Sequence, residues 1–362
     1  MKFKKKLLAM IATVALLATS ATTSVFAVPD PQNNGITTGG TLSIEKKLEL
    51  GENVTKVPNV KFGFEITPFT GIADTTEGHL PIKKDKALNN TDNIQVQFTK
   101  DTATEDEGNK KVAKQTATYD FSKAENVTFD AGAAVYYYKV TEKNDSKTGF
   151  EYDSTAYLLK VYVNENNKVE ALVAQKLNDT QTGVVGEKVP LTFCNKYDAE
   201  KLTVDKKVAG VSRDENKEFT FNLLVDPSDT LVANTKITAK KQTKEGTFTD
   251  VEVTVGQASQ FTLKHGEKLV CTDLPVGTNY TITEATATGY TTEVTTENTT
   301  EKDKTKGSFS IKDGDNKVHF TNTNNTITPT GLILNVAPYA AGLILVVGLG
   351  VLLVVKRRKV TE

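Results

Sequence analysis

Short runs of alternating apolar and polar residues cover most of the chain between Val28 and Asn325, with no convincing amphipathic helix among them. Apolar side chains at every second position are typical of strands with one buried face. Clusters of Asn, Asp, Gly and Lys separate the runs, as turns do. The pattern predicts an all-β chain of β-sandwiches. The clearest predicted strands are Leu42–Leu48, Phe62–Ile66, Val135–Glu142, Ala156–Val163, Phe219–Leu223 and Tyr280–Glu284.

The segment from Ile72 to Lys114 is more polar than its surroundings. It carries two charged runs, Lys83–Lys86 and Thr104–Glu107. Charged runs are most often solvated surface, so we interpret this segment as long loops.

An internal repeat becomes visible when the predicted strands are compared with one another. The matching pairs are Leu42–Leu48 with Leu202–Val208, Tyr138–Glu142 with Tyr280–Glu284, and Phe193–Asn195 with Phe320–Asn322. The repeat predicts two related domains, 38–199 and 200–325, that meet near Asp198.

The phase of these strands directs polar residues inward. Lys46 shares a face with Leu42, Ile44 and Leu48, so a lysine occupies a core position. By the same count, each domain points one Lys, one Glu and one Asn inward. These residues are Lys46, Glu142 and Asn195 in the first domain, and Lys206, Glu284 and Asn322 in the second.

A single inward polar residue is most simply a strand-end group that reaches solvent, but three types repeated in two domains make that explanation weaker. A buried ammonium and a buried carboxylate each cost several kcal/mol to desolvate, so they pair or become neutral. A neutral lysine is a nucleophile and a neutral glutamic acid donates a proton. An amine held against an Asn carboxamide beside such an acid has the groups needed to form an isopeptide bond with loss of ammonia.

The N-terminus predicts export. Residues 1–27 have a basic start, an apolar stretch from Leu7 to Ala18 and small residues before Val28, as secretory signal peptides do. A short N-terminal tail, 28–37, would follow.

The C-terminus carries an uncharged run of 24 residues, 332–355, and a basic tail, 356–362. The run is long enough to cross a bilayer as a helix, with the basic tail in the cytoplasm. One interpretation is an anchor that stays in the membrane. The other is a processed signal, because Pro329, Thr330 and Gly331 lie just outside the run.

Composition excludes several kinds of site. Without the predicted signal peptide and tail, eight of 44 basic residues and one of 45 acidic residues are lost, which leaves a net charge of about −8 and argues against nucleic acid as a partner. Cys194 and Cys271 cannot build a disulfide framework, and we interpret both as free thiols. The three histidines, His79, His265 and His319, have no metal-ligand spacing, so we expect no metal and no cofactor.

The C-terminal segment resembles the sorting signal of Gram-positive surface proteins. In that family the transpeptidase sortase cuts between Thr and Gly, here Thr330 and Gly331, and transfers the threonine acyl group to an amine. The usual motif is LPxTG, whereas this chain has Pro directly before Thr, in a sorting motif at 326–331 that reads Ile327, Thr328, Pro329, Thr330 and Gly331.

From about residue 38 to 331 the chain resembles the backbone pilins of Gram-positive pili, of the streptococcal T-antigen type. The similar motifs are Tyr136-Tyr-Tyr-Lys-Val-Thr-Glu142, Leu274-Pro-Val-Gly277, Lys188-Val-Pro-Leu-Thr-Phe-Cys-Asn195 and the Phe-Thr-Asn end of the second domain. The resemblance implies two tandem Ig-like (CnaB-type) sandwiches, each with a self-formed Lys–Asn bond.

The implied residue roles follow by position. The bonds would be Lys46–Asn195, assisted by Glu142, and Lys206–Asn322, assisted by Glu284. The Tyr-Pro-Lys and Trp-containing motif of other backbone pilins is absent, since the chain has no Trp. Lys188, out of phase with inward Val189, occupies the acceptor position of T-antigen-type pilins.

We therefore expect a structural subunit that sortase joins to identical subunits in a wall-anchored pilus, after a transient membrane stage. One alternative is a wall-anchored adhesin or accessory pilin that binds a host ligand. A secreted enzyme is the second alternative, with weak support, because the buried groups would act once on their own chain.

Overall fold

The computed structural model describes residues 35–296, 300–302 and 306–326. The chain divides into two compact units, Met1–Asp198 (unit 1) and Ala199–Glu362 (unit 2). The signal peptide, the sorting motif from Ile327 onward, the apolar run and the basic tail lie outside the described residues. Within the described ranges, no helix is long and apolar enough to span a membrane.

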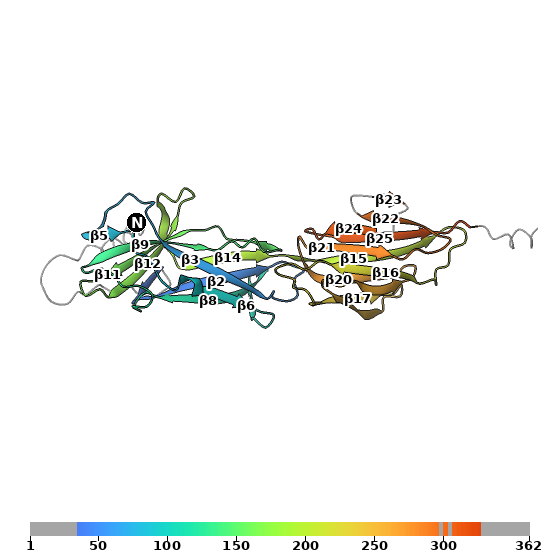
Figure 1. Ribbon diagram of the computed structural model, residues 1–362, viewed down its shortest axis with the longest axis horizontal. Coiled ribbons are helices and arrows are strands. Elements are labelled where there is room, and N and C mark those ends of the chain that lie inside the picture. The colour runs from blue at the N-terminus through green and yellow to red at the C-terminus, as the bar shows by residue number, and fades with distance from the viewer. Residues whose placement is uncertain (1–34, 297–299, 303–305, 327–362) are drawn as a thin grey trace, which may run out of the picture. The chain divides into compact units, whose positions relative to one another are not determined.

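The fold of both units is all-β, as the alternating pattern predicted (Figure 1). The elements of unit 1 are β1 (Ile36–Thr38), β2 (Thr41–Leu50), β3 (Val60–Pro68), β4 (Thr76–Glu77), β5 (Leu80–Lys83), the 3-10 helix η1 (Thr91–Asn93), β6 (Gln95–Phe98), β7 (Thr104–Glu107), β8 (Lys110–Asp120), β9 (Ala134–Glu142), β10 (Phe150–Glu151), β11 (Tyr157–Val163), β12 (Val169–Leu177), β13 (Val184–Lys188) and β14 (Leu191–Tyr197). Those of unit 2 are β15 (Ala199–Ala209), β16 (Phe219–Val225), β17 (Lys236–Gln242), β18 (Phe248–Thr254), β19 (Ser259–Leu263), β20 (Lys268–Pro275), β21 (Asn279–Glu284), β22 (Thr291–Thr296), β23 (Thr300–Lys302), β24 (Lys306–Ser310) and β25 (Asn316–Thr323).

Each unit consists of two sheets. In unit 1 a nine-stranded sheet follows the order β1-β12-β11-β9-β3-β6, with β13, β5 and β4 at its margins, and a five-stranded sheet follows β10-β14-β2-β8-β7. In unit 2 the sheets are β18-β17-β20-β15-β25-β22-β23 and β19-β16-β21-β24.

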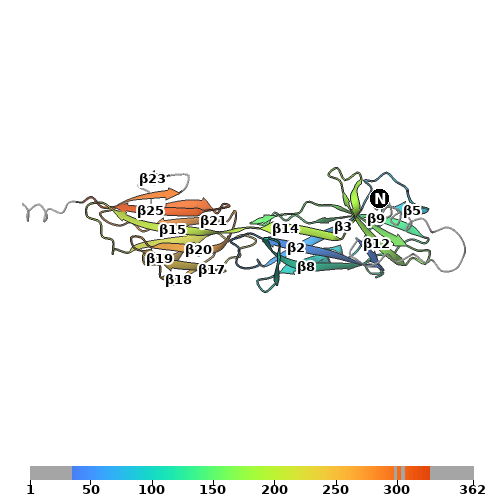
Figure 2. The ribbon, with the colours of Figure 1, turned by 180° about the vertical axis from the view of Figure 1, so that it is seen from behind.

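The first and last long strands of each unit are parallel neighbours, and this pairing positions the lysine and the asparagine. Phe193 of β14 lies opposite Lys46 of β2, so Asn195 is two residues further along the same face. In unit 2, Phe320 of β25 lies opposite Lys206 of β15, with Asn322 two residues on. Figures 1 and 2 show β2 beside β14, and β15 beside β25.

The inner faces of the sheets form the core, and they carry the apolar residues of the alternating runs. Burial alternates along β2 and β25 in register with the sequence pattern. In unit 1, β9 is buried on both faces, because Tyr137 points away from Tyr136 and Tyr138 into a second small cluster. Glu77 of β4 covers that outer face, where its carboxylate accepts hydrogen bonds from the Tyr137 hydroxyl (2.6 Å) and from Lys160 Nζ (2.9 Å).

The prediction of long loops from Ile72 to Lys114 is wrong, because β4 to β7 and the start of β8 lie in this range. The error arises from interpreting the charged runs as loops. The run at residues 104–107 is strand β7, which pairs with β8 and contributes Glu105 and Glu107 to ion pairs with Lys114. Gly108 takes a φ of 66° at its turn, a conformation that glycine adopts without strain. An edge strand that is exposed on both faces, as β7 is, needs few apolar residues.

Candidate functional site

In unit 1, three inward side chains meet between the two sheets. Lys46 Nζ lies 2.7 Å from Glu142 Oε2, and Asn195 Nδ2 donates to Glu142 Oε1 at 2.7 Å. The lysine and the asparagine come from one sheet, whereas Glu142, at the end of β9, comes from the other. One carboxyl group therefore bridges the amine and the carboxamide.

The unit 1 site is shielded from water. Lys46 and Asn195 are 0% exposed, as is the side chain of Glu142. The ring of Phe62 lies over the amine, with its centroid 4.9 Å from Nζ. Burial lowers the pKa of Lys46 and raises the pKa of Glu142, and their mutual attraction offsets this only in part.

Unit 2 repeats the arrangement with a different hydrogen-bond pattern. Lys206 Nζ lies 2.9 Å from Glu284 Oε1, and Asn322 Nδ2 donates to the same oxygen at 2.7 Å. Among the described residues, the buried Glu284 Oε2 and Asn322 Oδ1 have no hydrogen-bond partner. The two carboxamides are therefore held differently.

Burial perturbs the unit 2 groups in the same directions. It lowers the pKa of Lys206 to about 8 and raises the pKa of Glu284. The Phe219 ring centroid lies 4.1 Å from Lys206 Nζ and helps to exclude water from the amine.

These environments shift the amine and the acid toward their neutral forms. Transfer of one proton from lysine to glutamate converts a buried ion pair into two uncharged groups, which removes the cost of keeping two charges in the core. An uncharged amine carries a free electron pair for attack on a carbonyl carbon. The carboxyl group, in contact with both nitrogens, is placed to move protons between them.

The other candidate residues have different positions. Lys188 is exposed at the end of β13, just before the last strand of unit 1. Val189, expected to point inward, is only half-buried. Thr330, with the rest of the motif from Ile327 to Gly331, lies outside the described residues. The two cysteines are free thiols, Cys194 at the surface and Cys271 in the core of unit 2.

Sequence reasoning missed Asp153. Its backbone N–H donates to Asn195 Oδ1 at 2.8 Å, and its carboxylate accepts from the backbone N–H of Cys194. No residue of unit 2 matched it in the repeat, so comparison of the repeats gave no signal for it.

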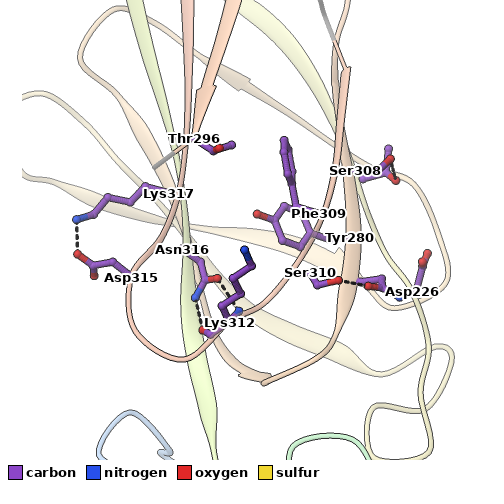
Figure 3. Close-up of a pocket in the computed structure, with 12 residues that line it drawn as sticks. Asp226, Tyr280, Thr296, Ser308, Phe309, Ser310, Lys312, Asp315, Asn316 and Lys317 are labelled. Carbon is purple, nitrogen blue, oxygen red and sulfur yellow. Dashed lines mark hydrogen bonds and ion pairs between the residues drawn. The ribbon is translucent and has the colours of Figure 1, made fainter. Parts of the chain in front are cut away.

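A surface pocket of about 530 Å³ in unit 2 is separate from these groups (Figure 3). Tyr280, Phe309 and Lys312 are among its lining residues, whereas Lys206, Glu284 and Asn322 do not line it.

Known proteins resemble the chain over nearly its whole length. A curated pilin of Streptococcus pyogenes serotype M1 is 34% identical over 358 residues, which cover 95% of this chain and 98% of that protein. The chain belongs to the pilin family. It is a structural pilin subunit, and its relatives are structural proteins of cell-surface pili.

Solved structures support the same assignment. The crystal structure of the major pilin from S. pyogenes is 32% identical in sequence and has a TM-score of 0.61. The alignment covers 80% of this chain and 100% of the pilin chain. The S. pyogenes major pilin T-13 is 26% identical, covers 80% and 99% of the two chains, and has a TM-score of 0.60.

Two further matches are partial. Residues 200–324 match a domain family of unknown function, DUF7601. The pilus tip adhesin Cpa of S. pyogenes is 39% identical over 132 residues, which are 36% of this chain and 18% of that adhesin.

Proposed function

We propose that this pilin is joined covalently to identical subunits by a pilus sortase, and that a self-formed Lys–Asn isopeptide bond stabilises each of its two domains, 38–199 and 200–325. The observation that carries the proposal is the repeated contact of one buried Glu carboxyl with a Lys amine and an Asn carboxamide. A purely structural ion pair would not need the Asn carboxamide. It would also not need the same three residue types in both units.

The chemistry follows from the contacts. The uncharged Nζ attacks Cγ of the asparagine, the carboxyl group carries protons from the attacking to the leaving nitrogen, and ammonia departs. The bonds are Lys46–Asn195 with Glu142, and Lys206–Asn322 with Glu284. Because each site reacts once with its own chain, the glutamates assist the reaction without making the protein an enzyme that turns over substrate.

The proposal also covers export and assembly. The chain is exported by its signal peptide, 1–27, and sortase cleaves between Thr330 and Gly331 and transfers Thr330 to Lys188 of the next subunit. These transfers build the pilus, and transfer of a Thr330 acyl group to a cell-wall amine instead would anchor it in the wall, in company with accessory pilins. The support is the similarity to pilins over 95% of the chain, together with the terminal sequence motifs.

Intact mass tests the internal bonds. Each bond releases one ammonia, about 17 Da, so the folded mature chain, residues 28–330, should be lighter than its calculated mass by about 34 Da. Glu142→Ala and Glu284→Ala should each restore about 17 Da by blocking one site. A wild-type chain at its full calculated mass rules out both bonds.

The adhesin alternative has one observation in its favour, the partial match to a tip adhesin, which covers 18% of that protein. A ladder of SDS-resistant multimers in wall extracts would distinguish the two functions, because an adhesin attached singly to the wall gives no ladder.

A further inference from the structure

The two carboxamides differ in what holds their oxygen. In unit 1, Asn195 Nδ2 donates to Glu142 while Oδ1 accepts the backbone N–H of Asp153 at 2.8 Å. In unit 2, Asn322 Nδ2 donates to Glu284, but its buried Oδ1 has no partner among the described residues.

This difference has a cause in the strand next to each asparagine. In unit 1 the neighbour is β10, only two residues long, whose pairing with β14 ends at Glu151 opposite Lys196. The chain then leaves the ladder, so the N–H of Asp153 is available to a side chain. In unit 2 the neighbour is β22, which pairs with β25 along its length and places Thr292 opposite Asn322. The backbone groups of β22 are therefore taken up by the hydrogen bonds of a regular ladder.

The side chain of Asp153 fixes this N–H in place. Asp153 Oδ2 accepts the backbone N–H of Cys194 at 2.8 Å, and Oδ1 accepts the backbone N–H of Thr155 at 2.8 Å. The carboxylate thus ties its own peptide to β14 on one side and to the following turn on the other.

We propose that the Asp153 backbone N–H is an oxyanion donor for isopeptide formation in unit 1, and that unit 2 reacts without such a donor. The inference rests on the proposed bond between Lys46 and Asn195. When Nζ bonds to Cγ, the carbonyl electron pair moves onto Oδ1, which becomes negatively charged. A donor at 2.8 Å is within the range at which backbone N–H groups stabilise such an oxyanion.

The remaining atoms balance through Glu142. Its neutral carboxyl gives a proton to Nδ2 from Oε1 and receives one from the attacking Nζ at Oε2, the two contacts that the structure shows. The Cγ–Nδ2 bond then breaks and ammonia leaves. The Lys46 nitrogen keeps one hydrogen as an amide, and Glu142 ends as it began, uncharged.

The experiment follows both bonds in one molecule. The mature chain is made by cell-free synthesis, samples are stopped in denaturant at timed intervals, and digestion with mass spectrometry measures the fraction of each cross-linked peptide. Unit 2 is an internal control for synthesis, folding conditions and recovery.

Asp153→Ala should slow formation of the Lys46–Asn195 bond about ten-fold or more, since losing one well-placed oxyanion donor costs on the order of 100-fold in rate and here the N–H is displaced instead of deleted. Asp153→Pro removes the N–H itself and should slow the bond at least as much. Asp153→Asn keeps one of the two acceptor oxygens and should be intermediate. The Lys206–Asn322 bond should form at the wild-type rate in all three.

A purely structural role for Asp153 is tested where no unit 1 bond can form. In an Asn195→Ala background, adding Asp153→Ala removes two hydrogen bonds and should lower the stability of unit 1, but unit 1 should stay folded at the temperature of the kinetic experiment. Unfolding of unit 1 at that temperature would overturn the inference. Rates of bond formation in Asp153→Ala and Asp153→Pro within about two-fold of the wild-type rate would also overturn it, because the loss of an oxyanion donor should have a larger effect. A wild-type chain without either bond would instead overturn the proposed function, and this inference with it.

Discussion

At the residue scale, the buried amine of Lys206 links protonation to stability. Its pKa is about 8 in the folded chain, because burial disfavours the charged form, against an ordinary value of 10.5. An unlinked Lys206 therefore binds fewer protons folded than unfolded between these two values. Stability must then rise with pH across that window.

The first prediction applies this to Asn322→Ala, which leaves Lys206 as a free amine. The difference in unit 2 stability between wild type and this variant should shrink as pH rises from about 8 to about 10, by at most about 1.4 kcal/mol per pH unit. In wild type the proposed bond makes that nitrogen an amide, which does not titrate. Urea unfolding read by pulse proteolysis of unit 2 measures the difference.

Lys206→Met is the matched control, because it also prevents the bond but has no amine. The difference in unit 2 stability between wild type and Lys206→Met should not shrink from about pH 8 to about pH 10. Any effect of Glu284 on stability in this window would also be seen in this control. A pH-independent difference in Asn322→Ala would contradict the assignment of a lowered pKa to Lys206.

Most of the candidate site could be predicted at this scale, because strand phase alone places Lys46, Glu142 and Asn195 on inward faces. Asp153 could not. Its contribution is a backbone N–H, which every residue except proline has, and its availability depends on where β10 leaves the ladder.

At the element scale, the proposed bonds join the first long strand of each unit to the last. In unit 1 these are β2 and β14, already parallel neighbours. A cross-link between Lys46 and Asn195 closes a loop of about 150 residues, and closing a loop of about 100 residues contributes on the order of 5 kcal/mol by chain entropy. The cross-link thus acts on nearly the whole of unit 1.

Asn195→Ala should therefore lower the thermal and protease resistance of unit 1 and leave that of unit 2 unchanged. The loss of stability has two sources. The cross-link is missing, and the buried Lys46 no longer has the Asn195 carboxamide beside it. Differential scanning calorimetry with protease mapping measures both units in one chain. Asn322→Ala is the reciprocal control, and equal losses in both units from either variant would contradict two independent cross-links.

The segment from Ile72 to Lys114 shows why some strands escape prediction. Buried strands such as β3 have apolar residues at every second position. The edge strand β7 is exposed at all four residues, and its partners are charges on neighbouring strands. Cross-strand pairing of this kind depends on register, which the sequence of a single segment does not contain.

At the scale of the whole molecule, the proposed bonds determine which part of the chain carries tension in a polymer. Force would enter at Lys188 and leave at Thr330. The residues that precede Lys188 then lie off the main-chain path between these points, and the Lys206–Asn322 bond bypasses most of unit 2. A subunit linked in this way transmits load with little chain available to extend.

The acceptor must be a lysine that a separate enzyme can reach after folding. Lys188 satisfies this requirement, because β13 is exposed along its whole length and ends at that residue. Its side chain is exposed, whereas the reacting groups of both units are buried, so replacing it should disturb neither internal bond.

Lys188→Ala should therefore abolish the SDS-resistant ladder in wall extracts while the monomer keeps the mass deficit of about 34 Da that two lost ammonia molecules imply. Lys188→Arg should behave in the same way, because a guanidinium stays protonated and is no nucleophile for the Thr330 acyl group. Lys176→Ala is the matched control, an exposed lysine on the adjacent strand β12, and its ladder should be normal. Ladders that persist in Lys188→Ala, with a peptide that joins Thr330 to another lysine, would move the acceptor to that lysine and leave the pilin assignment intact.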